Sequence, residues 1–250
     1  MLKEERYQKI LAMIDSEGIV KTSEVTKQLG VTEMTVRRDL KALEERGLLM
    51  RIHGGAKRKS EILVAELSHV EKKQLNIDEK KYVAKQAAAL VSENDSVFIG
   101  HGTTNEFIYD YLNVPYARII TNSLPVFTKF KGDERFELLL VGGRLRARSD
   151  VFIGSFTNHL LEKISVKIAF IGTNGIYGHQ VTNYNEEEGT SQKIILDNAS
   201  ERYILCDSSK LDKQDFFSFY RLEDVTAMIT DNKLEAKVKE RYERIVKVIN

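Results

Sequence analysis

Glycine, hydroxyl and amide residues gather at several points in the later part of the chain, each directly after a short apolar run. These clusters occupy residues 100–104, 121–123, 142–144, 172–175 and 207–210. Glycine lets backbone N–H groups approach a ligand closely, Thr and Ser add hydroxyl donors, and a helix that begins there contributes partial positive charge. Such groups bind phosphate, while amides and carboxylates bind sugar hydroxyls. The pattern therefore predicts a site for a phosphorylated sugar.

The candidate ligand residues divide into groups by role. We expect phosphate contacts from Gly102, Thr103 and Thr104, full positive charge from Lys210 and Lys193, hydroxyl contacts from Asn122, Asn174 and Asp207, and further contacts from His101, Ser123 and Gly143. Each cluster alone also fits a tight turn with a capped helix, Lys210 also fits a solvated lysine, and His101 also fits a turn cap. The prediction therefore depends on several clusters meeting at one edge.

A regular alternation of strands and helices must position these clusters. Strands are predicted at 96–99, 117–121, 136–141, 166–171, 202–206 and 227–230, and helices at 78–92, 105–111, 124–131, 156–164, 186–199 and 234–246. This alternation is typical of a mainly parallel sheet covered by helices, an α/β fold. The carboxyl ends of such strands share one edge of the sheet, and ligands bind at that edge.

The first 57 residues follow a different pattern, with three short helices and a hairpin. Helices are predicted at 3–16, from Thr22 to the break at Gly30, and after an N-cap at Thr32, and a strand at 48–52 leads into a glycine turn and basic residues at 53–58. Two helices joined by a tight turn, followed by such a wing, form a winged helix-turn-helix that fits the DNA major groove. The candidate DNA contacts are Thr22, Thr32, Glu33, Thr35, Arg37, Arg38, Lys41, His53 and Gly54. Asp39 would repel phosphate, so we expect it to pair with Arg37, Arg38 or the first helix.

Charge and composition divide the chain in the same way. The net charge is +1, yet residues 1–59 carry 13 Lys and Arg against 9 Asp and Glu, so the head is basic and the remainder slightly acidic. We predict a DNA-binding domain over 1–57, a linker over 58–75 and a sensor domain over 76–250.

Several classes of protein are disfavoured by the composition. No apolar run approaches the roughly 18 residues that span a bilayer, and the charged start lacks a signal-peptide core, so a cytoplasmic protein without membrane contact is expected. Cys206 is the single cysteine and lies in an apolar run, which indicates packing. His159 and His179 lack spaced partners, so neither a metal nor a cofactor is predicted.

Three segments of the head resemble the DeoR family of bacterial repressors: Arg6, Ile10 and Ile14 at spacings of four, residues 32–40, and residues 52–56. The strand-end clusters resemble the motifs of the family's sensor domain. The resemblance implies a repressor of a sugar-catabolic operon that a phosphorylated sugar releases from double-stranded operator DNA. It also implies a sensor fold similar to ribose-5-phosphate isomerase. Because operators of such proteins are typically repeats, a homodimer or homotetramer is expected.

Two other segments, residues 122–127 and 157–163, are most similar to the family's repressors of lactose catabolism. That similarity implies tagatose 6-phosphate as the candidate effector. Residues 171–174 and 185–189 depart from the expected pattern, which leaves the exact sugar open.

Two other functions are alternatives to a sugar-responsive repressor. A sugar-phosphate isomerase or deaminase fused to a DNA-binding head needs a carboxylate base. Where related isomerases carry an acidic turn, this chain has residues 172–175. The amide in this segment cannot act as a base. No catalytic residue is therefore predicted, and the protein is not expected to be an enzyme. A constitutive architectural DNA binder is disfavoured by the polar strand-end clusters.

Overall fold

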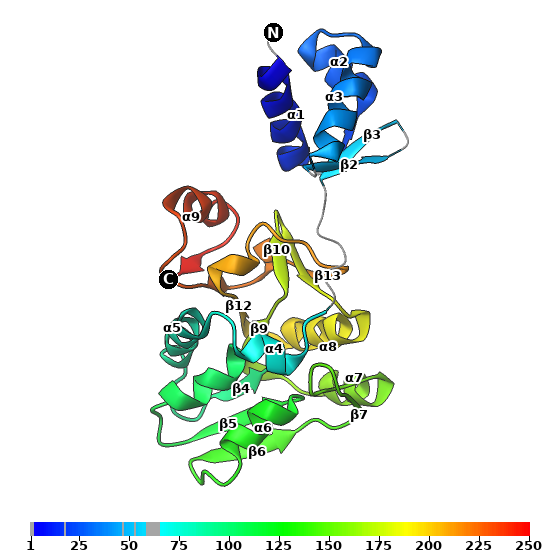
Figure 1. Ribbon diagram of the computed structural model, residues 1–250. Coiled ribbons are helices and arrows are strands. Elements are labelled where there is room, and N and C mark those ends of the chain that lie inside the picture. The colour runs from blue at the N-terminus through cyan, green and yellow to red at the C-terminus, as the bar shows by residue number, and fades with distance from the viewer. Residues whose placement is uncertain (1–2, 18, 47, 53, 59–65) are drawn as a thin grey trace. The chain divides into compact units, whose positions relative to one another are not determined.

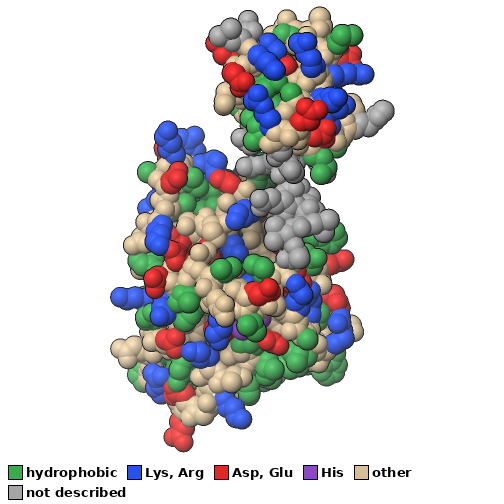
Figure 2. All heavy atoms as spheres, in the orientation of Figure 1, with side chains coloured by type: hydrophobic (Ala, Val, Ile, Leu, Met, Phe, Trp, Pro, Cys, Tyr) green, Lys and Arg blue, Asp and Glu red, His purple; other side chains and the backbone are tan. Residues whose placement is uncertain are grey.

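The computed structural model describes residues 3–17, 19–46, 48–52, 54–58 and 66–250. The chain forms two compact units that meet in sequence at Leu63 and Val64. We call them the head and the sensor domain. On the visible face of each, basic and acidic side chains are intermixed (Figure 2).

The head contains the three predicted helices and the predicted wing. Its elements are α1 (Lys3–Glu17), β1 (Ile19–Lys21), α2 (Thr22–Leu29), α3 (Glu33–Glu45), β2 (Leu49–Ile52) and β3 (Gly55–Arg58). The strands form an antiparallel sheet in the order β1-β3-β2, and β1 was not predicted because three residues carry no periodic signal. Gly30 ends α2 with a φ of 63°, a backbone conformation that glycine adopts without strain. Val25, Val36, Leu40 and Leu43 pack with α1 in a single core.

A seven-stranded sheet forms the centre of the sensor domain, in the order β15-β14-β12-β9-β4-β5-β6 (Figure 1). Its strands are β4 (Ser96–Ile99), β5 (Ala117–Thr121), β6 (Phe136–Leu140), β9 (Val166–Gly172), β12 (Ala199–Leu205), β14 (Ala227–Ile229) and β15 (Val248–Ile249). Every neighbouring pair is parallel. The prediction of an α/β domain with a mainly parallel sheet is therefore confirmed.

Helices cover both faces of this sheet. One face carries α5 (Ile77–Ala88), η1 (Asn105–Tyr111) and α6 (Leu124–Phe130), and the other carries α7 (Ser155–Leu161), α8 (Glu186–Asp197) and α9 (Ala236–Glu243). Val97 and Ile99 point to the first face while Phe98 points to the second, as the alternation of side chains along a strand requires. Burial on both faces explains why these strands are continuous apolar runs and were predictable.

Two smaller sheets and three short helices complete the sensor domain and were not predicted. They are the hairpin of β7 (Arg144–Arg146) and β8 (Val151–Ile153), the sheet of β10 (Gly175–Tyr177), β11 (Gln180–Asn183) and β13 (Phe217–Arg221), and the helices α4 (His69–Lys73), η2 (Ser208–Lys210) and η3 (Leu222–Asp224).

The predicted linker over residues 58–75 requires a correction. Residues 59–65 lie outside the described part of the chain, but residues 66–75 fold onto the sensor domain. Glu66 is 7% exposed and bonds to Arg146, and the His69 N–H donates to the Arg148 carbonyl at 2.9 Å. Ser68 caps α4 and its own N–H donates to Glu71 at 2.7 Å, which is a capping box.

Candidate functional site

A cavity of about 220 Å³ lies at the carboxyl ends of β4, β9 and β12. β4 and β9 are neighbours in the sheet, and from them the chain order runs outward in opposite directions, through β5 and β6 on one side and through β12 and β14 on the other. This reversal is the topological switch point at which open α/β sheets bind ligands. The fold therefore creates the cavity where the strand-end argument expected a site.

Seven of the predicted ligand residues line this cavity: His101, Gly102, Thr103, Thr104, Asn174, Asp207 and Lys210. They come from the segments that follow β4, β9 and β12. Gly102 has a φ of 134°, so the turn after β4 favours glycine. Thr103 and Thr104 are buried, with their segment leading directly into η1.

The other four predicted ligand residues, Asn122, Ser123, Gly143 and Lys193, are absent from the lining, and each has another structural role. The Asn122 amide donates to the Phe152 carbonyl of β8 at 3.0 Å, and Ser123 caps α6. A side chain at Gly143 would meet the Thr157 hydroxyl, since an added Cβ would lie 1.9 Å from its oxygen. Lys193 pairs with Asp197 along α8, with 2.5 Å between Nζ and Oδ2. The hairpin β7–β8 and α7 thus contact the segments after β5 and β6.

Lysines that the sequence analysis missed supply much of the cavity's positive charge. Lys72 of α4 and Lys80 of α5 line it, together with Lys213. The Lys72 Nζ donates to Asn174 Oδ1 at 3.2 Å, and the Lys80 Nζ donates to the Lys72 carbonyl. Burial lowers the pKa of both lysines, because an ammonium group loses hydration in the protein interior. The capping box at Ser68 was the one sequence signal that could have revealed α4.

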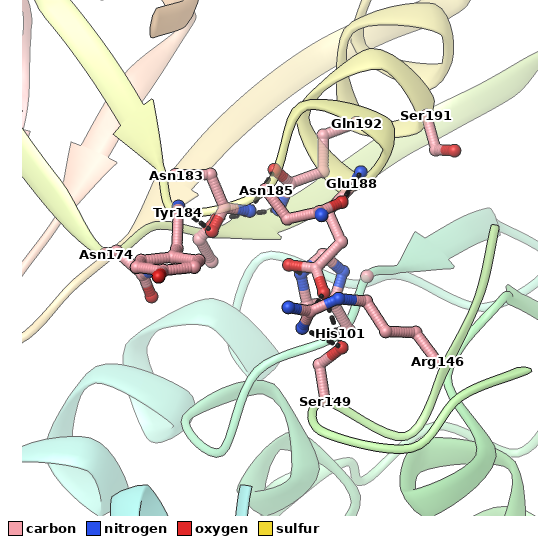
Figure 3. A network of polar contacts seen from close by, with 12 residues as sticks. His101, Arg146, Ser149, Asn174, Asn183, Tyr184, Asn185, Glu188, Ser191 and Gln192 are labelled. Carbon is pink, nitrogen blue, oxygen red and sulfur yellow. Dashed lines mark hydrogen bonds and ion pairs between the residues drawn. The ribbon is translucent and has the colours of Figure 1, made fainter. Parts of the chain in front are cut away.

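An acidic network forms another part of the cavity wall (Figure 3). Glu188 is 2% exposed, and its carboxylate lies 3.2 Å from His101 Nε2 and 3.0 Å from Arg146 Nη1. Burial alone would raise the pKa of Glu188, but His101, a hydrogen bond from Ser149 and the charge of Arg146 lower it to about 2. Glu188 is therefore ionised at neutral pH.

One ring nitrogen of His101 has no partner within this network. Its Nδ1 is buried and has no hydrogen-bond partner among the described residues. Because buried polar groups are normally satisfied, this nitrogen is an exception in the cavity wall.

The same network reaches the start of the sensor domain. Arg146 bonds at once to Glu188 and to Glu66, with 2.5 Å between Nη2 and Glu66 Oε2, and Arg148 adds a contact to Glu66 at 3.4 Å. Nearby, His69 of α4 bonds to Glu106 of η1. The cavity is thus connected by ion pairs to residues that follow residues 59–65 directly in the chain.

The first turns of α3 place most of the candidate DNA contacts on an exposed surface. Thr32 caps the helix by accepting from the Thr35 N–H at 3.3 Å, and the two hydroxyls lie 2.9 Å apart. Arg37 pairs with Glu33, with 2.6 Å between Nη2 and Oε1, while Arg38 and Lys41 are exposed. Of the alternative partners expected for Asp39, the structure shows the first helix: Arg6 contacts the buried carboxylate through Nε at 2.7 Å and Nη2 at 3.1 Å.

Thr22 differs from the other described DNA candidates because it is buried in the head. It is 7% exposed and is the first residue of α2. Its N–H donates to the carbonyl of Gly54, whose φ of 80° forms the exposed turn of the wing. His53 lies outside the described residues.

The described part of the chain has neither a side-chain cluster for a metal ion nor a helix that could span a membrane. There, no group of three His, Cys, Asp or Glu side chains is arranged to hold a metal ion. Cys206 is buried, and burial raises the pKa of its thiol. Of the helices in these ranges, none combines the length and the apolar character that crossing a bilayer needs.

Comparison with known proteins identifies both units. Residues 6–61 match the DeoR-like helix-turn-helix domain, and residues 75–232 match the DeoR C terminal sensor domain. The chain is 42% identical over 252 residues to a protein of Streptococcus mutans serotype c named lactose phosphotransferase system repressor, with 100% of both chains covered. Proteins of the same name from Staphylococcus epidermidis and Staphylococcus aureus (strain N315) are 39% and 38% identical and cover 100% and 96% of this chain.

Among solved structures, the chain is similar to ribose 5-phosphate isomerase A from Methanocaldococcus jannaschii, with a TM-score of 0.38 and 25% identity over 54% of this chain and 55% of the isomerase. The family matches cover both units, and the named relatives match along the full length. The chain therefore belongs to the DeoR family.

Proposed function

We propose that this chain represses genes of a lactose phosphotransferase system and leaves its operator when a phosphorylated sugar occupies the cavity of the sensor domain. The full-length relatives are named repressors of that system, which indicates a transcriptional regulator and not an enzyme. The helix-turn-helix head supplies the DNA contacts. Tagatose 6-phosphate is the proposed effector.

The observation that carries the sensing role is a set of lysines around one cavity that form no close ion pair with the carboxylates near them. Lys72, Lys80 and Lys210 come from three separate elements and line the same space. Within the described ranges, none of their ammonium groups forms an ion pair, although Lys80 is only 4% exposed. Buried charges are normally paired, so the arrangement favours an anionic ligand. A phosphate between these lysines and the hydroxyls of Thr103 and Thr104 would give the ammonium groups a directly bonded anion.

The remaining polar groups suit the hydroxyls of a sugar. Asn174 lies between Lys72 and Asp215, with its amide nitrogen 2.9 Å from Asp215 Oδ2. Asp207 accepts from the Asn76 amide at 3.0 Å and also bonds to Ser209. Together with His101 Nδ1, these groups offer both donors and acceptors, which a polyhydroxylated ligand requires. The cavity volume of about 220 Å³ favours one sugar ring over two.

The position of α4 suggests how occupancy affects DNA binding. Lys72 lies on α4, and Glu66 precedes that helix and closes the ion-pair chain from His101 through Glu188 and Arg146. A phosphate that draws Lys72 toward it would change the contacts that hold α4 and Glu66 on the sensor domain. These residues follow the segment that leads back to the head. The ligand must favour the DNA-incompetent arrangement, and a coupling of about 1–3 kcal/mol changes operator affinity about 5- to 150-fold. A homodimer or homotetramer would place two heads on a repeated operator.

The experiment is a calorimetric panel on the purified full-length chain with tagatose 6-phosphate, other hexose and pentose phosphates, free tagatose and inorganic phosphate. We expect tagatose 6-phosphate to bind most tightly and free tagatose not to bind measurably. If no sugar phosphate bound, the sensing role would be wrong. Binding of another sugar phosphate in preference would retain the site and change the effector.

A further inference from the structure

The exposed face of α3 has a regular pattern that the polar residues alone do not reveal. Val36, Leu40 and Leu43 are buried at spacings of four and three. Met34, Arg38 and Lys41 repeat the same spacing and are exposed. At 100° per residue, this second row lies on the opposite side of the helix from the buried row. Met34 therefore points away from the core of the head.

Met34 is unusually exposed for an apolar residue. Its exposed fraction is 81%, the highest among the large hydrophobic side chains that the structure describes. It lies in the first turn of α3, the part of a recognition helix that reaches base edges in the major groove. The cost of keeping this side chain in water is recovered if the bound DNA covers it.

The neighbouring polar groups are already engaged within the helix. Glu33 is paired with Arg37, and the hydroxyls of Thr32 and Thr35 bond to each other. Arg38, one turn after Met34, forms no ion pair or hydrogen bond through its side chain with any other described residue. Because Lys41 pairs with Glu45 at 3.9 Å, the groups left available in this row are one apolar side chain and one guanidinium.

We propose that Met34 is a specificity-determining residue that packs against the C5-methyl group of a thymine in the operator. The thymine methyl is the apolar group that base pairs expose in the major groove, and cytosine lacks it. Methionine suits this contact because its thioether is flexible and polarisable. Arg38 then contacts an adjacent phosphate. The inference depends on the proposed DNA-binding function and adds to it the base that the first turn of α3 reads.

The test removes single methyl groups from the DNA. An operator is first selected from random-sequence duplexes with the full-length chain, and each thymine is then replaced in turn by deoxyuridine, which keeps the base pairing and lacks the methyl group. We expect wild-type affinity to fall about fourfold at one or two positions in each half-site, the equivalent of one buried methyl group. In Met34→Ala these same replacements should change affinity by less than about 1.5-fold.

Two variants separate this contact from general effects. Met50→Ala removes another exposed methionine of the head and should keep the wild-type response to deoxyuridine. Arg38→Ala should weaken binding to all duplexes and reduce its salt dependence while keeping that response. The proposal is overturned if the wild type tolerates every replacement, or if Met34→Ala loses as much affinity as the wild type at the sensitive positions. Failure of the wild type to select any sequence would overturn the DNA-binding function and this inference with it.

Discussion

Replacing Lys72 by Gln removes one ammonium group from the cavity and keeps a side chain of similar reach. Two unit charges about 4 Å apart attract by about 4 kcal/mol at an effective dielectric constant of about 20, and lost hydration offsets part of this. A charge-assisted hydrogen bond is worth about 1.5–3 kcal/mol net. Because Lys80 and Lys210 still face the ligand, we expect the affinity for tagatose 6-phosphate to fall about 10- to 100-fold.

Lys73 provides the matched control on the same helix. Its Nζ lies 3.0 Å from Glu106 Oε2, half of its side chain is exposed, and it is absent from the cavity lining. Calorimetry should show Lys73→Gln within about twofold of the wild type, and neither variant should change operator affinity without ligand. Equal losses in both variants, or an undiminished affinity in Lys72→Gln, would refute the assignment of Lys72 to the phosphate.

Three further predictions follow from the cavity and the head. Burial lowers the pKa of Lys72 and Lys80, and a bound phosphate favours their charged forms. Ligand binding should therefore take up protons, and it should weaken as pH rises toward the lowered pKa. Calorimetry in buffers of different ionisation enthalpy measures this proton uptake, which should be smaller in Lys72→Arg because arginine stays charged. Burial opposes the ionisation of Glu188, but its partners lower its pKa from 4.5 to about 2. The ionised carboxylate therefore stabilises the fold above pH 4.5, and this effect is lost as pH falls toward 2. Denaturant unfolding should show that acid reduces the free energy of unfolding by about 3 kcal/mol less in Glu188→Gln than in the wild type. Asp39→Ala leaves the buried Arg6 without its bidentate partner, so calorimetric scanning should show the head melting more than about 5 °C lower and the sensor domain unchanged.

The central strands were predictable because they are buried on both faces. Continuous apolar runs such as residues 96–99 and 166–171 allow few alternatives, and the structure places strands there. Short elements such as β7 and β10 carry only three residues each and depend on tertiary contacts for their conformation. Helix α4 was missed because a charged five-residue segment has no apolar periodicity, and it is held instead by contacts with Arg148 and Glu106.

The candidate site was predictable in part because parallel strands end at the same edge of the sheet. The strand ends predicted a ligand site at Thr103, Asn174 and Asp207. These residues line the cavity and follow strands at or next to the switch point. The strand ends also placed Asn122 in the same site, although Asn122 bonds to Phe152 of β8. Lys72 could not be predicted in this way, since it precedes β4, the first strand of the seven-stranded sheet, and reaches the cavity from a helix. Spatial proximity between distant segments was the information that the sequence pattern lacked.

The most direct test of the central claim is a titration of tagatose 6-phosphate into a preformed complex of the full-length chain and its labelled operator, followed by fluorescence anisotropy. The account predicts release of the DNA at ligand concentrations near the calorimetric dissociation constant. In Lys72→Gln, release should require about 10- to 100-fold more ligand. A complex that stayed intact while calorimetry showed the cavity occupied would contradict the claim that the sensor domain controls the head.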